Sequence, residues 1–539
     1  MKQRETNVER PWLKHVVPGN PKEVKIPIIS VTQLLDESIA KYPNHTAMTF
    51  FGKTISYKEL SNNIQKVAKA LSKIGVGKGD RVAIMLPNCP QYPMSFYSIL
   101  TCGAIVVQVN PMYKASELIH ILNDSGAKVI IVMDQLLPLI EAVRAHTSIE
   151  EIFAVSVESA YMPDELLIED QNKFQRVEIN PIEDVAVLQY TGGTTGTPKG
   201  AMLTHFNIVA NTIQSEATAT VKVKRGEERV LTISPLFHVY GMTSAMSVTF
   251  YIGGNLILVP KFDVEMVIDI IDKTKPTSFP GVPTMFIALV NYYNVKKFDL
   301  SCFNICSSGS APLPIEIINR FNEISGTSVA EGFGLSEASP VTHRNPVEGL
   351  QKIGSIGIPI PNTDARIVDI ATGEQNLAVG EVGELVINGP QVMKGYWNKP
   401  EETNIAIRNG WLYTGDLAKM DEDGFFFIVG RKKEMIIASG YNVYPIEVEN
   451  IIYKHPAVLE VAVIGIPHEY RGEAIKAVVV LKDGYDVTPE QLIDFCRSQL
   501  SAYKVPEEIQ FVNELPKTAV GKILKRNLIM QFNSQSEQV

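Results

Sequence analysis

The chain has 539 residues, more than one hydrophobic core usually organises, so its length predicts two or more domains. Hydrophobic residues make up 45% of it and charged residues 20%, which is typical of a globular soluble protein. The formal net charge of −9 argues against a general nucleic-acid-binding protein.

The apolar runs and the cysteines bear on where the protein works. Residues 1–10 lack the apolar core of a signal peptide, and the longest apolar stretch, near 99–109, is too short to cross a bilayer. The five cysteines show no zinc-ligand spacing, which favours free thiols in a reducing compartment. We therefore expect a cytoplasmic protein, and peripheral contact with the inner face of the membrane stays open.

The first 330 residues alternate between helical and extended patterns. Apolar residues recur at helical spacing before the first strand, and short β-branched runs follow. The clearest segments are a helix over 60–71, a strand over 81–87, a helix over 116–123 and a strand over 128–133. Such alternation predicts the α/β class, with parallel sheets covered by helices.

From about Gly354 the pattern changes to short runs separated by turns, which predicts a small antiparallel barrel or sheet. The turn at 420–424 lies between two apolar strands. Beyond a charged stretch at 430–434, the remaining residues alternate as a compact α+β unit. We place the boundary there and predict a large domain over 1–430 and a small one over 434–539.

One loop, Thr191–Gly200 (TGGTTGTPKG), holds four glycines, four threonines and a single lysine. A strand is predicted before it, and 201–204 is either a second strand or the run into a helix near Asn207. Glycines let backbone N–H groups converge on an anion, threonine hydroxyls add donors, and Lys199 adds a point charge. Phosphate binding is favoured over a mobile surface turn. The spacing fits neither the P-loop nor the dinucleotide fingerprint.

This loop resembles the signature of the adenylate-forming enzymes: acyl-CoA synthetases, peptide-synthetase adenylation domains and beetle luciferases. Further segments match that family in its order along essentially the whole chain. The matching segments are Tyr190–Gly200, PLFHVYG at 235–241, SGSAP at 308–312, EGFGLSE at 331–337, YTGD at 413–416 with Gly430 and Arg431, GYNVYP at 440–445 with Glu447, and PKTAVGK at 516–522.

The resemblance implies a fold and a reaction. The expected fold is a large domain of two helix-covered sheets plus a small β-barrel, followed by a mobile α+β lid. The chain looks most like bacterial long-chain fatty acid–CoA ligases. Such enzymes transfer AMP from ATP to a carboxylate, release pyrophosphate, and pass the acyl group to the thiol of coenzyme A, with Mg²⁺ as cofactor.

The resemblance also implies roles for residues at the phosphates. Glu337 and Thr191 are expected to bind Mg²⁺, and Ser336 the α-phosphate. Read alone, Ser336 is equally an N-cap and Glu337 a surface carboxylate. The β- and γ-phosphates are expected to contact Thr191, Gly192, Gly193, Thr194, Thr195, Gly196 and Lys199.

Adenine and ribose have their own expected partners. Phe333 is expected to stack on adenine, and Asp416 to accept both ribose hydroxyls with support from Arg431. His238 is expected between the carboxylate and the phosphates, with a core histidine as the alternative. The other expected nucleotide contacts are Gly309, Ser310, Ala311, Glu331, Gly332 and Gly334.

The small domain carries the moving parts that the resemblance implies. Lys522 is expected to stabilise charge in the adenylation transition state. Lys433 matches the family's hinge. A swing about it would withdraw Lys522 and bring Gly440 and Tyr441 to line a tunnel for the pantetheine arm of coenzyme A.

The acyl pocket is expected to involve His238, Val239, Gly281, Val282 and Gly334. Short-acid relatives carry tryptophan at the position of Gly334, so glycine favours a long chain. A ligase for an aromatic or medium-chain acid and a luciferase-like oxygenase remain alternatives. A peptide-synthetase adenylation module and a non-catalytic binding protein are further alternatives. The expected partners are small molecules, and the oligomeric state, a homodimer included, stays open.

Overall fold

The computed structural model describes residues 9–168, 174–191, 197–438, 441–468, 472–518 and 521–536. The chain divides into two compact units, Met1–Asp364 with Ile387–Leu412, and Ala365–Val386 with Tyr413–Val539. This division shows which residues pack together, and it does not show which parts move. The domain boundary predicted at 430–434 and the hinge predicted at Lys433 therefore stay predictions.

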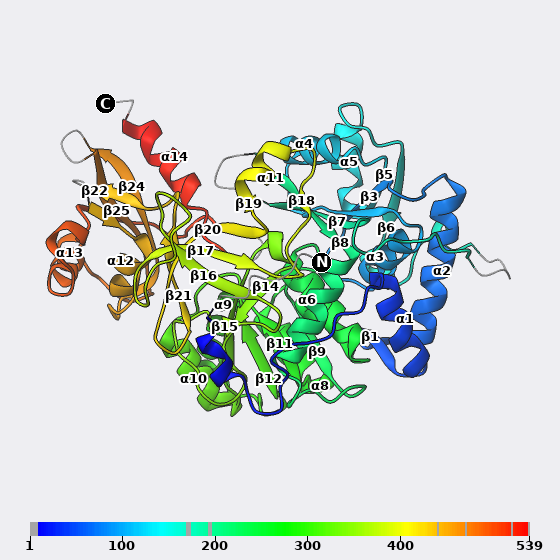
Figure 1. The fold of residues 1–539 in the computed structure, drawn as a ribbon, viewed down its shortest axis with the longest axis horizontal. Helices are drawn as coiled ribbons and strands as arrows, with labels where there is room; N and C mark the ends of the chain where they lie inside the picture. The colour runs from blue at the N-terminus through cyan, green and yellow to red at the C-terminus, as the bar shows by residue number, and fades with distance from the viewer. Residues whose placement is uncertain are drawn as a thin grey trace. The chain divides into compact units, whose positions relative to one another are not determined.

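The first unit contains a seven-stranded sheet (Figure 1). Its inner strands pair in parallel, and the two strands at one edge pair antiparallel. In spatial order the strands are β18 (Gly395–Tyr396), β8 (Lys199–Thr204), β7 (Val185–Thr191), β4 (Ile105–Gln108), β3 (Arg81–Met85), β5 (Val129–Met133) and β6 (Glu151–Val155).

A second sheet of nine strands lies in the same unit and is also parallel at its centre. Antiparallel strands close both of its edges. In spatial order the strands are β15 (Ile358–Pro359), β14 (Val341–Arg344), β13 (Val329–Gly334), β12 (Ile305–Ser308), β11 (Ser278–Gly281), β9 (Arg229–Thr232), β10 (Asn255–Leu258), β1 (Thr46–Phe50) and β2 (Lys53–Ser56).

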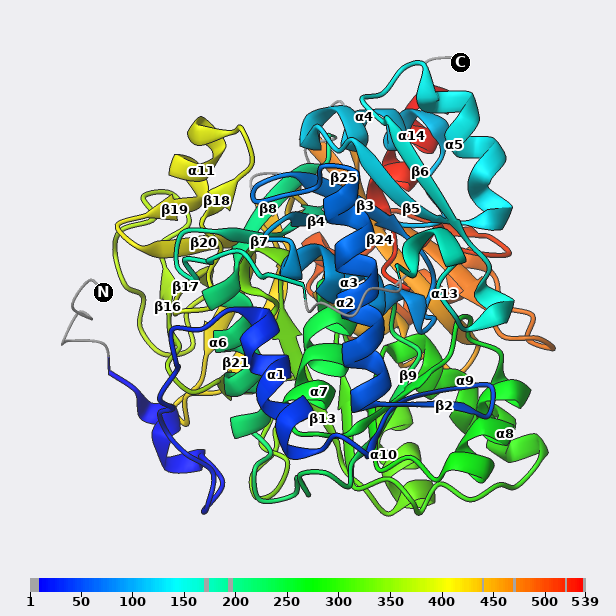
Figure 2. The ribbon, with the colours of Figure 1, turned by 90° about the vertical axis from the view of Figure 1, so that its right-hand side faces the viewer.

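Helices cover both sheets, and α1, α2 and α3 lie against one another (Figure 2). The helices of this unit are α1 (Val31–Lys41), α2 (Tyr57–Lys73), α3 (Gln91–Thr101), α4 (Ala115–Ser125), α5 (Leu137–Arg144), α6 (His205–Ala217), α7 (Val248–Tyr251), α8 (Val264–Thr274), α9 (Pro283–Val295), α10 (Ile315–Ser325) and α11 (Pro400–Ala406). The predicted α/β architecture is confirmed.

Helix α2 shows how the sequence specifies one of these elements. The Ser56 hydroxyl accepts the Glu59 backbone N–H at 3.2 Å, and the Glu59 carboxylate accepts the Ser56 N–H at 2.8 Å. This reciprocal cap satisfies donors at the helix start that are otherwise left without partners. The predicted apolar face, at Leu60, Ile64, Val67 and Leu71, is buried at 0–3% exposure.

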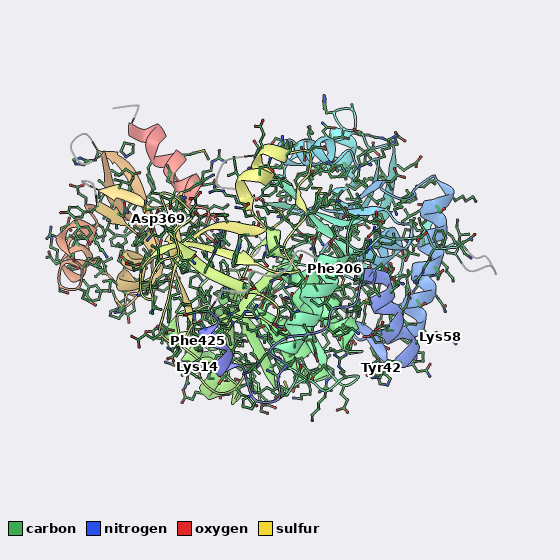
Figure 3. The ribbon with its side chains drawn as sticks, in the orientation of Figure 1. Lys14, Tyr42, Lys58, Phe206, Asp369 and Phe425 are labelled. Carbon is green, nitrogen blue, oxygen red and sulfur yellow. The ribbon has the colours of Figure 1, made fainter. Side chains whose placement is uncertain are left out.

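The second unit contains most of a sheet made of β16 (Asp364–Val368), β17 (Gly383–Asn388), β20 (Trp411–Met420), β21 (Phe426–Arg431) and the short β19 (Ile407–Arg408), in which β19 and β21 pair antiparallel with β20. Asp364, the whole of β19 and the ends of β17 and β20 belong to the first unit. The predicted turn at 420–424 joins β20 to β21. Phe425, which follows it, is fully buried (Figure 3).

A last sheet carries the C-terminal helices. Its strands are β23 (Tyr441–Val443), β22 (Ile436–Ala438), β25 (Gly472–Leu481), β24 (Val458–His468) and β26 (Glu508–Phe511), and its helices are α12 (Pro445–Ile452), α13 (Pro489–Arg497) and α14 (Lys525–Ser536). The α+β unit predicted at the C-terminus is confirmed. Among the described residues, no helix is both long and apolar enough to cross a membrane.

Candidate active site

The threonine- and glycine-rich loop joins two paired strands. Strands β7 and β8 run antiparallel, with Thr191 opposite Lys199 and Tyr190 opposite Gly200. Of the two readings left open for residues 201–204, the strand is therefore correct. The loop starts and ends at facing positions of a hairpin, which holds Thr191 and Lys199 close together. Outside the described residues lie Gly192, Gly193, Thr194, Thr195 and Gly196.

Two side chains of α4, His120 and Asp124, contact this hairpin. The Tyr190 hydroxyl donates to the Asp124 carboxylate at 2.7 Å. His120 lies 3.0 Å from the Pro198 carbonyl oxygen, which accepts its Nε2–H. The two contacts fix the strand before the loop and the end of the loop itself. Both contacts hold residues that flank the predicted phosphate loop, and its contact with phosphate stays a prediction.

Glu337 and Lys199 meet through a residue that sequence reasoning missed. The Tyr396 hydroxyl donates to Glu337 Oε1 at 2.8 Å. Lys199 Nζ lies 5.3 Å from the centroid of the same ring. Tyr396 belongs to β18, where it pairs with Ala201. The structure therefore brings two predicted site residues together although they are far apart in the chain.

The position of Ser336 decides between its two readings. Ser336 is the first residue of a short 3₁₀ helix at Ser336–Ala338, whose N-cap is Leu335 and which has no side-chain cap. The N-cap interpretation of Ser336 is therefore wrong. The surface-carboxylate interpretation of Glu337 fails as well, since Glu337 is half-buried and hydrogen-bonded to Tyr396.

The donor set near Glu337 suits a hard cation. Glu337 Oε1 accepts from Tyr396, and in the described part of the chain Oε2 has no hydrogen-bond donor. No group of three His, Cys, Asp or Glu side chains that suits a metal occurs among the described residues. Mg²⁺ is usually held through one or two carboxylates plus substrate phosphates. One carboxylate near the ends of the predicted phosphate loop fits that pattern.

His238 lies in a well-anchored turn. Its Nδ1 accepts the Tyr240 backbone N–H at 3.3 Å, which places the ring proton at Nε2. The Leu236 N–H donates to the Asn88 side chain at 2.8 Å. A π-helix, Tyr240–Ser247, follows directly. Such helices are rare and often occur at functional sites. This favours a functional role for His238 over that of a core histidine.

The predicted adenine site gathers two loops around Glu331. The Glu331 carboxylate accepts the backbone N–H of Leu313 at 3.2 Å and of Gly354 at 3.3 Å. Burial raises the pKa of this carboxyl in spite of those donors. Its side chain thus holds the 309–313 loop, in which Ser310 has a φ of +73°. Direct contact of Glu331 with a nucleotide stays a prediction.

Phe333 lies near this loop with a defined neighbour. Its ring meets that of His343 edge-on, with the centroids 6.2 Å apart. His343 is fully buried, and desolvation lowers its pKa to about 3, so it stays neutral at physiological pH. Phe333 itself is half-buried. Phe333 thus packs against His343, and stacking of the Phe333 ring on adenine stays a prediction.

The residues predicted for the acyl pocket differ in their surroundings. Val239 and Val282 are each 1% exposed, and Val282 belongs to the core of the nine-stranded sheet. A Cβ on Gly281 would lie 2.8 Å from the rings of Phe279 and Phe286. Gly281 and Val282 therefore face a packed core in this structure, and their contact with an acyl chain stays a prediction.

The space around Gly334 leaves less room for a side chain than its sequence context indicates. A Cβ there would lie 2.3 Å from the Pro340 carbonyl oxygen, closer than real Cβ contacts come. Any side chain at this position must displace backbone. The open acyl pocket inferred from glycine thus competes with a second explanation, which is the close approach of two chain segments.

Substitution of Gly334 separates these explanations. We expect Gly334→Ala to lower the midpoint of thermal unfolding, because overpacking costs about 1–3 kcal/mol, without changing the ratio of acetate to palmitate activity. Gly334→Trp should lower stability further and also raise that ratio. Pyrophosphate release with each acid measures it. Equal ratios for the two variants would remove Gly334 from the acyl pocket.

Asp416 and Arg431 face each other across β20 and β21 of the second unit. Arg431 Nε donates to Asp416 Oδ1 at 3.1 Å, and Asp416 is 5% exposed. Burial raises the pKa of the Asp416 carboxyl, whereas the Arg431 and Lys522 charges oppose that rise. The predicted support of Asp416 by Arg431 agrees with this ion pair.

Glu384 of β17 is a second residue that sequence reasoning missed. Its Oε1 accepts the Gly415 N–H at 3.2 Å, and its Oε2 pairs with Lys432 Nζ at 3.0 Å. The Lys432 N–H in turn donates to the Gly415 carbonyl at 2.9 Å. Glu384 thereby holds β20 at Gly415, next to Asp416. The GEL sequence at 383–385 was a signal for a buried carboxylate inside a strand.

Lys522 lies in the same cluster of charges. Burial and the Arg431 charge lower its pKa to about 8, while Asp416 and Glu434 act in the opposite direction. Its backbone is held by Thr518, whose hydroxyl accepts the Lys522 N–H at 3.1 Å. The structure therefore brings Lys522 to Asp416 within the second unit.

The two described residues that remain from the predicted lid, Lys433 and Tyr441, are exposed. Lys433 is exposed within the turn that the Glu434 N–H closes on the Arg431 carbonyl at 2.9 Å. Tyr441 is 58% exposed and stacks on Tyr503, with the ring centroids 4.7 Å apart. Gly440 lies outside the described residues. The hinge and the coenzyme A contact stay predictions.

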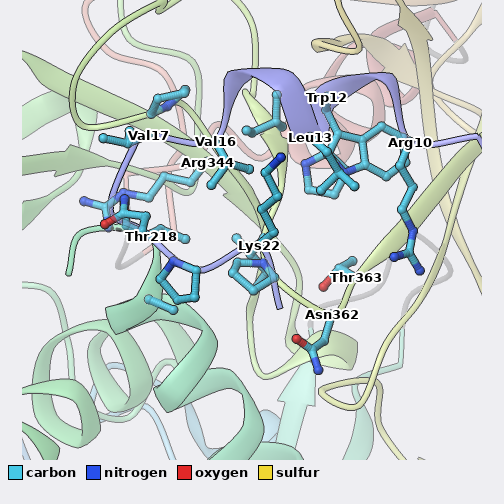
Figure 4. Close-up of a pocket in the computed structure, with 18 of the residues that line it drawn as sticks. Arg10, Trp12, Leu13, Val16, Val17, Lys22, Thr218, Arg344, Asn362 and Thr363 are labelled. Atoms are coloured by element: carbon cyan, nitrogen blue, oxygen red, sulfur yellow. Dashed lines mark hydrogen bonds between the residues drawn. The ribbon is translucent and has the colours of Figure 1, made fainter. Parts of the chain in front are cut away.

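A cleft with about 530 Å³ of empty space lies elsewhere in the first unit (Figure 4). It is lined by the N-terminal segment, including Arg10 and Trp12, by Arg344, and by the stretch that ends at Thr363. None of the predicted site residues lines it. We therefore define the candidate site by the contacts among the motif residues, and this cleft is not part of it.

The chain belongs to the AMP-binding enzyme family. The model of that family matches residues 35–397, and that of the AMP-binding enzyme C-terminal domain matches residues 447–522. The two matches contain the segments on which the resemblance was based, apart from those between them. Membership is consistent with the two sheets and the C-terminal α+β unit.

Relatives that match over nearly the whole chain indicate which members of this family it resembles. The chain is 46% identical to a long-chain-fatty-acid–CoA ligase of Bacillus subtilis, over 97% of this chain and 98% of the relative. It is 37% identical to a feruloyl-CoA synthase of an Amycolatopsis species, over 91% and 96%. Among solved structures, ATP-bound MatB from Rhodopseudomonas palustris superposes with a TM-score of 0.85 at 30% identity, covering 94% of this chain and 99% of that one.

Proposed function

We propose that this chain activates a long-chain fatty acid with ATP and transfers it to coenzyme A. The observation that carries the proposal is the 46% identity, over nearly the whole of both chains, with a ligase of that name. The site geometry supports it, because Lys199 and Glu337 are brought together in one unit and Asp416 and Lys522 in the other.

The first half-reaction joins the carboxylate to AMP. A carboxylate oxygen attacks the α-phosphorus of ATP, the bond from that phosphorus to the bridging oxygen breaks, and pyrophosphate leaves. The charges involved repel one another strongly. Lys199 and the donors of its loop neutralise the β- and γ-phosphates, and Lys522 stabilises charge at the carboxylate and α-phosphate. Asp416 accepts hydrogen bonds from the ribose.

Mg²⁺ belongs to this proposal as well. Glu337 and Thr191 are the residues that would hold it, and when bound it supplies charge neutralisation at the phosphates. Ser336 binds the α-phosphate, and Phe333 stacks on adenine with Gly309, Ser310 and Ala311 opposite. These roles follow the resemblance, and the observed contacts of Glu337 and of the 309–313 loop support them.

The second half-reaction forms the thioester. The sulfur of coenzyme A attacks the acyl carbonyl carbon, AMP leaves, and the thiol proton passes to solvent. A swing about Lys433 withdraws Lys522 and brings Gly440 and Tyr441 to the pantetheine arm. Peripheral membrane contact and the oligomeric state, a homodimer included, stay open in this proposal.

One assay tests the substrate class. Pyrophosphate release is measured with acids from acetate to oleate, with and without coenzyme A. We expect the highest kcat/KM with saturated acids of long chain, because each buried methylene contributes about 0.8 kcal/mol. Thioester product should require coenzyme A. Activity confined to short acids would overturn the long-chain assignment.

A second candidate is a ligase for an aromatic acid. The specific observation that favours it is the 37% identity with a feruloyl-CoA synthase. Ferulate and palmitate in the same assay distinguish the two candidates. A luciferase-like oxygenase would be recognised by light emission with luciferin and oxygen.

The charge of Lys522 makes adenylation dependent on pH. Its pKa is lowered to about 8 by burial and by Arg431. Only the protonated form carries the charge that adenylation needs, so kcat/KM for pyrophosphate release should hold below pH 8 and fall as the pH rises through 8. The pH profile of kcat/KM reports the free enzyme.

Substitution by arginine provides the control for this profile. Because a guanidinium stays charged far above pH 8, Lys522→Arg should remove the alkaline fall, although its absolute rate is lower. A fall with the same midpoint in Lys522→Arg would assign the titration to another group.

A further inference from the structure

Tyr396 contacts two residues that the proposed function assigns to the phosphate site, Glu337 and Lys199. Its hydroxyl donates to Glu337 Oε1 at 2.8 Å, and its ring lies under Lys199 Nζ at 5.3 Å from the centroid. A cation within about 6 Å of an aromatic centroid is attracted to it. One side chain therefore contacts the expected metal ligand and the expected phosphate ligand together.

The backbone holds Tyr396 in place. Tyr396 pairs with Ala201 across β18 and β8, and the neighbouring Trp397 N–H donates to the Gly200 carbonyl at 2.8 Å. The Tyr396 N–H donates to the Thr403 hydroxyl at 2.9 Å. These bonds hold β18 against β8, the strand that begins at Lys199. The Tyr396 ring therefore stays close to the Lys199 side chain.

The hydroxyl of Tyr396 is directed at Glu337, whose Oε1 accepts its hydrogen bond at 2.8 Å. By occupying Oε1 of Glu337 it leaves Oε2 as the oxygen available to a cation, and it restricts rotation of the carboxylate.

We propose that Tyr396 is a positioning residue of the nucleotide site, which orients Glu337 toward the cation and keeps Lys199 beside it. The inference rests on the proposed function of that site. A hydrogen bond that orients a metal-ligating carboxylate commonly changes metal affinity by 10- to 100-fold when it is removed. The effect therefore falls on cation binding more than on acid recognition.

The test measures cation binding without turnover. Mn²⁺ replaces Mg²⁺, ATP is present, and the fatty acid is omitted, so that no reaction occurs. Free Mn²⁺ is followed by electron paramagnetic resonance. We expect Tyr396→Phe, which keeps the ring under Lys199, to weaken Mn²⁺ binding in the presence of ATP by about 10-fold or more.

Tyr292→Phe is the matched control. Like Tyr396, Tyr292 is half-buried and donates to a carboxylate, that of Glu265, at 2.8 Å, and it lies on α9, outside the predicted site. Both variants lose one hydroxyl that donates to a carboxylate. The control should leave Mn²⁺ affinity unchanged, which separates orientation of Glu337 from general loosening.

A double variant tests the route of the effect. If Tyr396 acts through Glu337, then Tyr396→Phe should have no further effect on Mn²⁺ binding in a Glu337→Gln background. Equal Mn²⁺ affinity in wild type and Tyr396→Phe, or an unchanged effect in the Glu337→Gln background, would overturn the inference. Wild-type protein that releases no pyrophosphate with any acid would instead overturn the proposed function.

Discussion

Lys522→Ala should lose ATP- and acid-dependent pyrophosphate release by about 10²- to 10³-fold, the scale for removing one charge-stabilising donor. Synthetic acyl-AMP with coenzyme A should still give acyl-CoA at near the parent rate, because the lysine has withdrawn by that step. The fold should be retained. The Lys522 N–H still donates to the Thr518 hydroxyl, and its carbonyl still accepts the Thr518 N–H at 2.8 Å.

Lys517→Ala is the control on the same loop. Lys517 pairs with Glu460 at 2.5 Å and has no role in the expected site. A partly exposed ion pair of this kind contributes at most about 1 kcal/mol, so both half-reactions should stay near the parent rates. Equal loss of both half-reactions in Lys522→Ala would show that the lysine is structural or shared between them.

Lys433→Pro should spare adenylation and slow thioester formation by about 10²-fold, the cost of a small misplacement of reacting groups. Proline fixes φ at the expected pivot and so opposes the swing. In the described part of the chain, the Lys433 N–H makes no hydrogen bond that proline would remove. Rates of pyrophosphate release and of acyl-AMP conversion by coenzyme A, measured separately, give the two effects.

Lys433→Ala completes this test. Proline disfavours the α region for the residue before it, and Lys433 occupies the third position of the turn from Arg431 to Glu434. A modest loss of stability in Lys433→Pro is therefore expected. The alanine variant has no such restriction and should match the parent in both half-reactions. A proline variant that slows both equally would contradict a hinge at this residue.

Much of the fold was predictable because its signals are local. The helix at 57–73 has its apolar face at Leu60, Ile64, Val67 and Leu71, and a reciprocal cap at Ser56 and Glu59. Strand and helix boundaries in the sheets depend on such spacing within a few residues. The choice between strand and helix run at 201–204 was different, because pairing of β8 with both β7 and β18 decided it.

The sequence by itself determined the ordered motifs, the class of phosphate loop and the alternation of helices and strands, since each depends on residues close together in the chain. Only the tertiary structure showed that Tyr396 joins Glu337 to Lys199, that Glu384 contacts both Lys432 and β20 at Gly415, and that Gly334 lies against Pro340. These contacts come from strand pairing and packing between distant segments. Local spacing does not encode which distant side chains meet, because that depends on how the sheets pair and how the side chains between them fill the space.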